Sequence, residues 1–294
     1  MISMKKKGIF RFRGWIQAAA TLLTNIHIPN FFKGKIYTGS GKNICVPGLN
    51  CYSCPGAAGS CPIGAMQSVT ADRKHSIPYY ALGLVLFMGT VLGRLICGFL
   101  CPFGWFQELL YKIPPKRKLK VPEKPDKVFR YLKYLILVVF VLVLPNVLTN
   151  QFGQGSPYFC KWICPAGTLE GGIPLILTNP TLKNMLGGTF WWKMALLIMT
   201  IVSSWMIYRP FCKYICPLGA LYALMNKISI IRMNLDRESC ISCGKCVRSC
   251  PMQVDVLKNI NSLECIRCGR CAEVCPTGAI DLRMGKIKLM KNEK

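Results

Sequence analysis

Two runs of cysteines near the C-terminus share the spacing C-x2-C-x2-C-x3-C-P. The first run is Cys240, Cys243, Cys246 and Cys250, and the second is Cys265, Cys268, Cys271 and Cys275. This spacing binds two [4Fe–4S] clusters, and the fourth cysteine of each run ligates the other cluster. Zinc ribbons and disulfides also use cysteine, but they rarely combine a third C-x2 step with C-P twice. We therefore predict one cluster on Cys240, Cys243, Cys246 and Cys275 and another on Cys250, Cys265, Cys268 and Cys271.

Two cysteine pairs in the middle of the chain have the spacing C-x3-C-P-x-G. They are Cys97 with Cys101 and Cys212 with Cys216, and the segments 94–113 and 209–228 around them align. Proline fits the first position of a helix, and the start of a helix favours an anionic group. Four thiolates are the number that one [4Fe–4S] cluster needs. We predict that these four cysteines hold an inner cluster, with packed structural thiols or a zinc site as the alternatives.

Six cysteines remain, and they exceed the needs of one cluster: Cys45, Cys51, Cys54, Cys61, Cys160 and Cys164. All six are candidates for binding a cofactor. The repeat predicts an outer cluster on Cys160, Cys164 and two of Cys51, Cys54 and Cys61, and Cys54 and Cys61 are the iron ligands we favour. A self-contained site of Cys45, Cys51, Cys54 and Cys61 is an alternative. A surplus pair such as Cys45 and Cys51 could form a disulfide outside the cytoplasm.

Long hydrophobic segments must position these cysteines, because 52% of the residues are hydrophobic. Crossing a bilayer takes about 20 apolar residues. The candidates are Pro78–Ile96, Tyr131–Leu148 and Phe190–Tyr208, and a fourth is Trp15–Phe32, for which an amphipathic helix at the membrane interface is the alternative. We expect an all-α membrane bundle of about four transmembrane helices in two related halves. It would occupy residues 1–227 and be followed by a small α+β bacterial-type 2[4Fe–4S] ferredoxin domain at 228–294.

The formal charge of +26 is distributed as in a membrane protein. Basic residues gather before the first hydrophobic segment and between Lys112 and Lys133, whereas the other connections carry fewer. Cytoplasmic loops of membrane proteins show this excess of Lys and Arg. We therefore expect a multi-pass protein of the cytoplasmic membrane, with its N-terminus and ferredoxin domain in the cytoplasm. Nucleic acid is not an expected partner.

The cysteine pattern from Pro78 to Ile280 resembles the NapH/NosR-like family of membrane polyferredoxins. The resemblance rests on the C-x3-C-P pairs at Cys97/Cys101 and Cys212/Cys216 and on the eight ferredoxin cysteines. It implies a membrane electron carrier linked to quinol oxidation or to flavin-bearing partners. The segment 45–61 and the pair Cys160/Cys164 depart from that pattern. They resemble a subgroup with FMN-binding partners outside the cytoplasm.

These observations favour a transmembrane electron conduit, in which electrons pass from the ferredoxin clusters through the inner and outer clusters to a partner such as an FMN-binding flavoprotein. Two alternatives are a quinol dehydrogenase subunit that feeds a reductase, with a quinone site, and a thiol–disulfide relay. We expect a subunit of an oxidoreductase system rather than a stand-alone catalyst, and no residue is assigned a catalytic role. Gln67, Gln107 and Glu108 follow C-P-x-G motifs and could hydrogen-bond a cluster.

Overall fold

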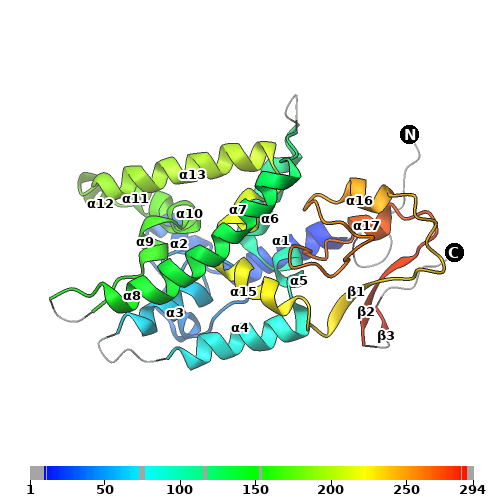
Figure 1. The fold of residues 1–294 in the computed structure, drawn as a ribbon. Coiled ribbons are helices and arrows are strands. Elements are labelled where there is room, and N and C mark those ends of the chain that lie inside the picture. Colours follow the sequence, from blue (N-terminus) through cyan, green and yellow to red (C-terminus); the bar gives the residue numbers. More distant parts are fainter. Residues whose placement is uncertain are drawn as a thin grey trace.

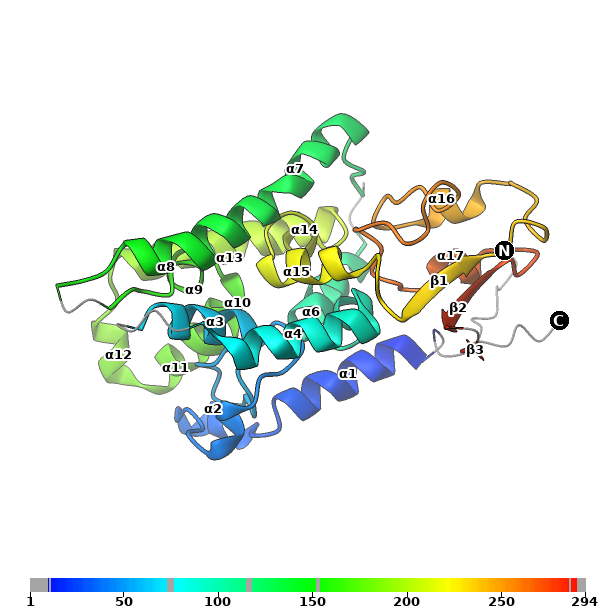
Figure 2. The same cartoon turned by 60° about the horizontal axis from the view of Figure 1, so that its bottom comes forward.

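The computed structural model describes residues 10, 12–72, 77–114, 118–151, 154–285 and 287–289. Helices form an elongated body, and the C-terminal cysteine-rich segment packs against one end of it (Figure 1). The same arrangement is visible after rotation (Figure 2). Phe10, the first described residue, lies at the cysteine-rich end and packs on Phe99, with the ring centroids 6.1 Å apart.

Prolines set the starts of the helices that follow the cysteines. Helices α3 (Pro62–Thr70), α6 (Pro102–Lys112), α10 (Pro165–Gly167) and α15 (Pro217–Met225) each begin at a proline directly after a cysteine. A missing N–H does no harm at the first helical position, where no intrahelical partner exists. Each of these cysteines therefore lies at a helix N-terminus.

Further helices complete the helical body. They are α1 (Arg13–Thr24), α2 (Pro29–Lys33), the 3-10 turn η2 (Ser40–Asn43), α4 (Tyr79–Leu92), α5 (Leu95–Phe99), α7 (Glu123–Ile136), the π-helix η3 (Leu137–Val143), α8 (Leu144–Val147), α9 (Tyr158–Trp162), the π-helix η4 (Thr168–Gly172), α11 (Ile173–Thr178), α12 (Pro180–Asn184), α13 (Gly188–Met206) and α14 (Pro210–Tyr214). Helices α7, η3 and α8 run on as one element from Glu123 to Val147.

The C-terminal segment is a small α+β unit. Strands β1 (Ile231–Leu235), β2 (Ile280–Met284) and β3 (Ile287–Lys288) form an antiparallel sheet in the order β1-β2-β3. In its register Leu235 pairs with Ile280 and Met233 with Leu282. Helices α16 (Lys245–Ser249) and α17 (Arg270–Glu273) lie between β1 and β2 in the chain. The sheet, Val256 and Phe99 share one buried apolar cluster, so the unit packs on the helical body through α5.

The expectation of about four transmembrane helices is wrong. Among the described residues, Glu123–Val147 is the one helix long and apolar enough to cross a membrane. The predicted segment Trp15–Phe32 is divided because α1 ends at Thr24, and α4 ends at Leu92 before Gly93, whose φ of +56° breaks the helix. Helix α13 has 19 residues, but Lys193 and several Trp, Thr and Ser residues lower its hydropathy.

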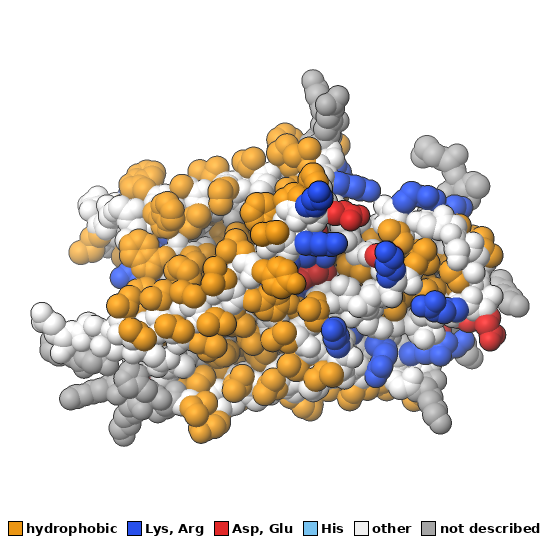
Figure 3. Space-filling model, viewed as in Figure 1, with side chains coloured by type: hydrophobic (Ala, Val, Ile, Leu, Met, Phe, Trp, Pro, Cys, Tyr) orange, Lys and Arg blue, Asp and Glu red, His pale blue; other side chains and the backbone are white. Residues whose placement is uncertain are grey.

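Large apolar side chains nevertheless cover the outside of the helical body (Figure 3). Examples are Phe87 on α4, Leu135 on α7 and Met199 on α13, which are 64%, 59% and 56% exposed. Contiguous apolar surface of this kind is rare on soluble monomers and marks contact with a membrane or a protein. Lys and Arg side chains gather instead around the cysteine-rich end (Figure 3).

Candidate iron–sulfur sites

The eight C-terminal cysteines lie in two groups, each around one cavity. Cys240, Cys243, Cys246 and Cys275 line the first, together with Leu235 and Ile280. Cys250, Cys265, Cys268 and Cys271 line the second, together with Met233 and Met252. The fourth cysteine of each run thus lies with the first three of the other run. We call these groups the distal and the proximal site; iron ligation by them stays a prediction.

The backbone repeats its conformation in the two sites. Ser242 and Arg267 each directly precede the second cysteine of their run, and their φ angles are 50° and 52°. Gly244 and Gly269 follow with φ of 68° and 80°. A positive φ is energetically unfavourable for residues other than glycine, so the surrounding structure must hold Ser242 and Arg267 in this conformation. Here they turn each loop so that its successive thiols border the same cavity.

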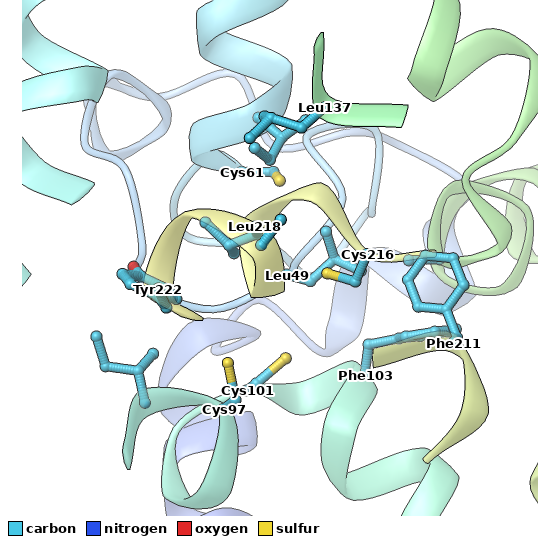
Figure 4. Close-up of a cluster of buried hydrophobic side chains, with 14 of the residues drawn as sticks. Leu49, Cys61, Cys97, Cys101, Phe103, Leu137, Phe211, Cys216, Leu218 and Tyr222 are labelled. Atoms are coloured by element: carbon cyan, nitrogen blue, oxygen red, sulfur yellow. The ribbon is translucent and has the colours of Figure 1, made fainter. Parts of the chain in front are cut away.

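Cys97, Cys101, Cys212 and Cys216 border a third cavity, the inner site, which Leu49 and Tyr222 also line. All four cysteines are buried. Figure 4 shows the sulfurs of Cys97, Cys101 and Cys216 around this space. The backbone N–H groups of Gly104 and Gly219 donate to Cys101 Sγ at 3.4 Å and Cys216 Sγ at 3.3 Å. Four thiols with N–H donors from two helix N-termini fit an anionic cluster.

Cys51, Cys61, Cys160 and Cys164 come together as the outer site. Burial raises the pKa of Cys160 well above its usual value, and the neighbouring thiols of Cys164, Cys61 and Cys51 raise it further. Cys51 Sγ also lies beside the helix that Cys164 caps, 3.5 Å from where a Cβ on Gly167 would stand. This group differs in one member from the set of ligands that we favoured from the sequence, because it contains Cys51 in place of Cys54.

Cys54 and Cys45 have hydrogen-bonding partners outside this group. Cys54 Sγ donates to Asn25 Oδ1 at 3.4 Å, and Cys45 Sγ lies 3.4 Å from Ser60 Oγ. All eighteen cysteines are described and all are free thiols, so the structure contains no Cys45–Cys51 disulfide. Within the described residues no group of three or more His, Cys, Asp or Glu side chains is arranged to hold a single metal ion.

One short segment touches both the inner and the outer site. Pro47, Gly48 and Leu49 line the cavity of the inner site, and Cys51, two residues after Leu49, belongs to the outer site. Tyr222 fixes the segment by donating its hydroxyl to the Pro47 carbonyl at 2.8 Å. Consecutive Cα atoms are about 3.8 Å apart. The inner and outer sites are therefore close neighbours along the loop 47–51.

Buried ion pairs join the helical body to the C-terminal unit beside the inner site. Glu264 accepts from Arg94 at 2.8 Å and from Lys133 at 2.5 Å. On its own, burial would raise the pKa of Glu264, but Arg94 and Lys133 lower it to about 2. Within the helical body, Glu108 accepts from Arg13 and Arg209 at 2.6 and 2.7 Å, and Arg270 of the C-terminal unit lies 3.7 Å from the same carboxylate. Charged side chains that are buried in pairs hold the two parts in one orientation.

Arg94 and Arg209 occupy aligned positions in the two repeat segments, and their contacts are reciprocal. Arg94 Nη2 donates to the Cys212 carbonyl at 3.3 Å, and Arg209 Nη1 donates to the Cys97 carbonyl. Each guanidinium therefore fixes the cysteine loop of the other repeat, and both side chains are fully buried. The sequence alignment contained both arginines, but their crossed pairing is visible only in the structure.

Comparisons with known proteins agree with this geometry. A family of 4Fe-4S dicluster domains matches residues 232–276, and a family of 4Fe-4S binding domains matches residues 77–122, 134–173 and 189–237. No solved structure matches the chain.

Three relatives show how far the similarity extends. The uncharacterised protein MJ0750 of Methanocaldococcus jannaschii is 32% identical over 61% of this chain and 68% of its own length. The methylamine utilization ferredoxin-type protein MauN of Paracoccus denitrificans is 26% identical over 65% and 60%. The regulatory protein NosR of Pseudomonas aeruginosa is 32% identical over 53% and 20%. The chain thus spans only part of each relative.

Cysteine sites and matching domains together define an iron–sulfur protein of the electron-transfer type, with [4Fe–4S] clusters as its cofactors. Within that class, the chain belongs to the NapH/NosR-like family of polyferredoxins. The resemblance expected from the cysteine motifs is thereby confirmed.

Proposed function

We propose that this protein conducts electrons between a redox protein in the cytoplasm and a partner at the opposite end of its helical body. Four cysteine groups would hold [4Fe–4S] clusters: the distal, proximal, inner and outer sites. Such clusters supply reversible one-electron transfer. In Figures 1 and 2 the C-terminal unit, helices α5, α6 and α15 of the inner site, and helices α3, α9 and α10 of the outer site follow one another along the body.

The observation that carries this proposal is the loop 47–51. It provides Cys51 to the outer site, and its residues Gly48 and Leu49 line the cavity of the inner site. On the other side, Cys97, Ile266 and the partly buried Cys268 of the proximal site belong to one apolar cluster. A chain that only stored clusters would have no need of such adjacency.

The distal site is the part of the series that a soluble protein can reach. Cys243 is exposed, whereas the other seventeen cysteines are buried or partly buried. Ile241 beside it is 64% exposed, and the exposed side chains of Arg237 and Lys245 flank the same loop. The two exposed cations Arg237 and Lys245, with Glu238 as an exposed acid beside them, favour an acidic electron-transfer protein. We propose that such a protein exchanges electrons with this chain here.

The apolar surface supports a membrane location for the helical body. Glu123–Val147 is long enough to cross a bilayer, and the exposed apolar side chains of α4 and α13 would lie against lipid. The basic residues at the C-terminal unit would then lie in the cytoplasm, as the excess of Lys and Arg in cytoplasmic segments requires. The partner at the other end would be a redox protein outside the cytoplasm, such as an FMN-binding flavoprotein.

Iron analysis and EPR spectroscopy of anaerobically purified protein test the conduit. Four cubane clusters contain about 16 iron atoms per chain, and the two ferredoxin-type clusters alone contain about 8. We expect a value near the higher number and four reducible centres. A value near the lower number, with alkylatable thiols at Cys97 and Cys160, would refute the conduit.

One cavity favours the quinol dehydrogenase alternative. It has a volume of about 430 Å³ and lies between α1, α6 and the C-terminal unit, where Arg13, Trp105 and the proximal-site residue Cys268 line it. A quinone analogue that blocks reduction of the proximal centre would support this function. Unchanged reduction in the presence of the analogue would leave the conduit as the better account.

A further inference from the structure

Two fully buried glutamines occupy equivalent positions in the inner and outer sites. Gln67 follows Cys61 in the sequence CPIGAMQ, and Gln107 follows Cys101 in the sequence CPFGWFQ. Both side chains have 0% exposure. A buried amide needs partners for its NH2 group and for its oxygen. The hydrogen-bond partners of the two glutamines therefore determine which way each amide points.

At the inner site, Gln107 Nε2 donates to Cys212 Sγ at 3.1 Å, and Gln107 Oε1 accepts from the N–H of Phe211 at 3.2 Å. At the outer site, Gln67 Nε2 donates to Cys160 Sγ at 3.3 Å, and Gln67 Oε1 accepts from the N–H of Phe159 at 3.0 Å. A flipped amide would set its NH2 group against the phenylalanine N–H. The backbone therefore fixes each NH2 group towards sulfur.

The inner and outer sites therefore share the same arrangement of glutamine, cysteine and phenylalanine. The glutamine partners lie in the matching sequences FCKWICP (159–165) and FCKYICP (211–217). One site combines the segments 61–67 and 159–165, and the other combines 101–107 and 211–217. The sites differ in their charged neighbours. Arg94 and Arg209 flank the inner site, whereas Lys193 contacts the Cys160 carbonyl at 3.1 Å and Glu170 accepts the Cys51 N–H at 2.7 Å in the outer site.

We propose that Gln67 and Gln107 are positioning residues, each of which sets the reduction potential of its own site through one N–H···S hydrogen bond. This inference rests on the proposed function, because it requires clusters at both sites. Reduction adds negative charge to a cluster and its thiolates, and an N–H donor stabilises that charge. Hydrogen bonds to the sulfurs are among the determinants of cluster potential. Loss of the donor should make its own site harder to reduce.

The test is an EPR-monitored redox titration of purified holoprotein with the single substitutions Gln107→Leu and Gln67→Leu. Each removes the donor while keeping a side chain of similar size. We expect the midpoint potential of the inner centre alone to fall in Gln107→Leu, and that of the outer centre alone to fall in Gln67→Leu. A tenfold change in the reduction equilibrium corresponds to 59 mV for one electron. Each variant serves as the matched control for the other.

Two results would overturn the proposal: potentials that stay unchanged in both variants, or a single substitution that shifts both centres equally. Gln107→Met and Gln67→Met are second variants, since the flexible methionine fills the same space without a donor. Loss of iron from the altered site in both the Leu and the Met forms would assign the glutamines to cluster assembly and reject tuning. A wild-type iron content near 8 per chain would refute the proposed function itself. A content near 16 with unmoved potentials would refute the glutamine role alone.

Discussion

Cys51 and Cys54 are close in the sequence, but their thiols have different surroundings. Cys51 lies among Cys61, Cys164 and the carboxylate of Glu170, and burial, the largest influence, raises its pKa to about 12. Cys54 is also influenced by the Glu170 carboxylate, but its thiol donates to Asn25, and Lys42 donates to the Cys54 carbonyl at 3.2 Å. A bound cluster would keep the Cys51 sulfur deprotonated despite its burial. We therefore predict that Cys51 is a cluster ligand and that Cys54 is a packed thiol.

Serine substitutions of these two residues should have opposite results. Cys51→Ser removes a thiolate of the outer site, so we expect the variant to lose about four iron atoms and the signal of one centre. Cys54→Ser is the matched control, and we expect it to keep its iron because its hydroxyl can still donate to Asn25. Iron analysis and EPR of the two purified variants provide the measurement. Iron loss from Cys54→Ser with full loading of Cys51→Ser would reverse the assignment.

The sequence could not choose between these cysteines. The spacing from Cys240 to Cys275 is local, so the pattern alone predicted which thiols group in the distal and proximal sites, and the structure groups them in that way. The loop 45–61 has no such regular spacing. Its shape depends on contacts with distant residues, such as the hydrogen bond from Asn50 to the Thr24 carbonyl and that from Cys51 to Glu170. Only the fold brings those partners together.

At the scale of elements, the C-terminal unit is held to the helices by Glu264, which joins Arg94 before α5 to Lys133 on α7. Glu264→Gln would leave two buried cations without a counter-charge. Removing one member of a buried ion pair typically destabilises a protein by about 3–5 kcal/mol. We therefore expect thermal unfolding of the purified holoprotein at a clearly lower temperature.

Asp255→Asn is the control for this substitution. Asp255 and Lys258 form an exposed pair with an N···O distance of 3.9 Å, and such pairs contribute about 0–1 kcal/mol. Equal unfolding temperatures for the two variants would contradict the structural role of Glu264. The depressed pKa also predicts a pH dependence. The contribution of Glu264 is complete above its ordinary value of 4.5 and is lost as the pH falls towards about 2.

The number of spanning helices was the part of the fold that composition predicted badly. A run of apolar residues does not show where a helix ends, and the left-handed Gly93 ends α4 after 14 residues. The sequence also did not show which residues of the two repeats contact each other. Sequence similarity aligned 94–113 with 209–228 and predicted that Cys97, Cys101, Cys212 and Cys216 act together, and these four cysteines line one cavity. The crossed contacts of Arg94 and Arg209, and of Gln67 and Gln107, depend on how distant helices pack.

For the whole molecule, the decisive property is the contrast between its two surfaces. Apolar side chains cover the helical body, and Lys and Arg side chains gather around the cysteine-rich end (Figure 3). A negatively charged partner would approach this end faster at low ionic strength, because salt screens the attraction between opposite charges. The surface should therefore control the rate of electron exchange more than the final equilibrium.

Charge reversal at Arg237 and Lys245 tests this expectation. Lys245→Glu and Arg237→Glu should slow reduction of the protein by a small acidic electron carrier several-fold at low salt, and the difference should shrink at high salt. Lys227→Glu is the control, since Lys227 is exposed but lies in the connection between α15 and β1. Stopped-flow absorbance gives the rates. Equal slowing by all three substitutions would show that net charge, and not this face, governs the encounter.

The loop 47–51 has a consequence for how the protein is built in the cell. Because Gly48 and Leu49 line the inner site and the last residue of the loop is Cys51 of the outer site, a cluster bound at one proposed site should help to position the residues of the other. Iron insertion should then be cooperative, and half-loaded molecules should be scarce during maturation. Gly48 makes this arrangement vulnerable, since a Cβ there would lie 3.0 Å from Cys101 Cα. A single added methyl group at that position should impair maturation of both centres together.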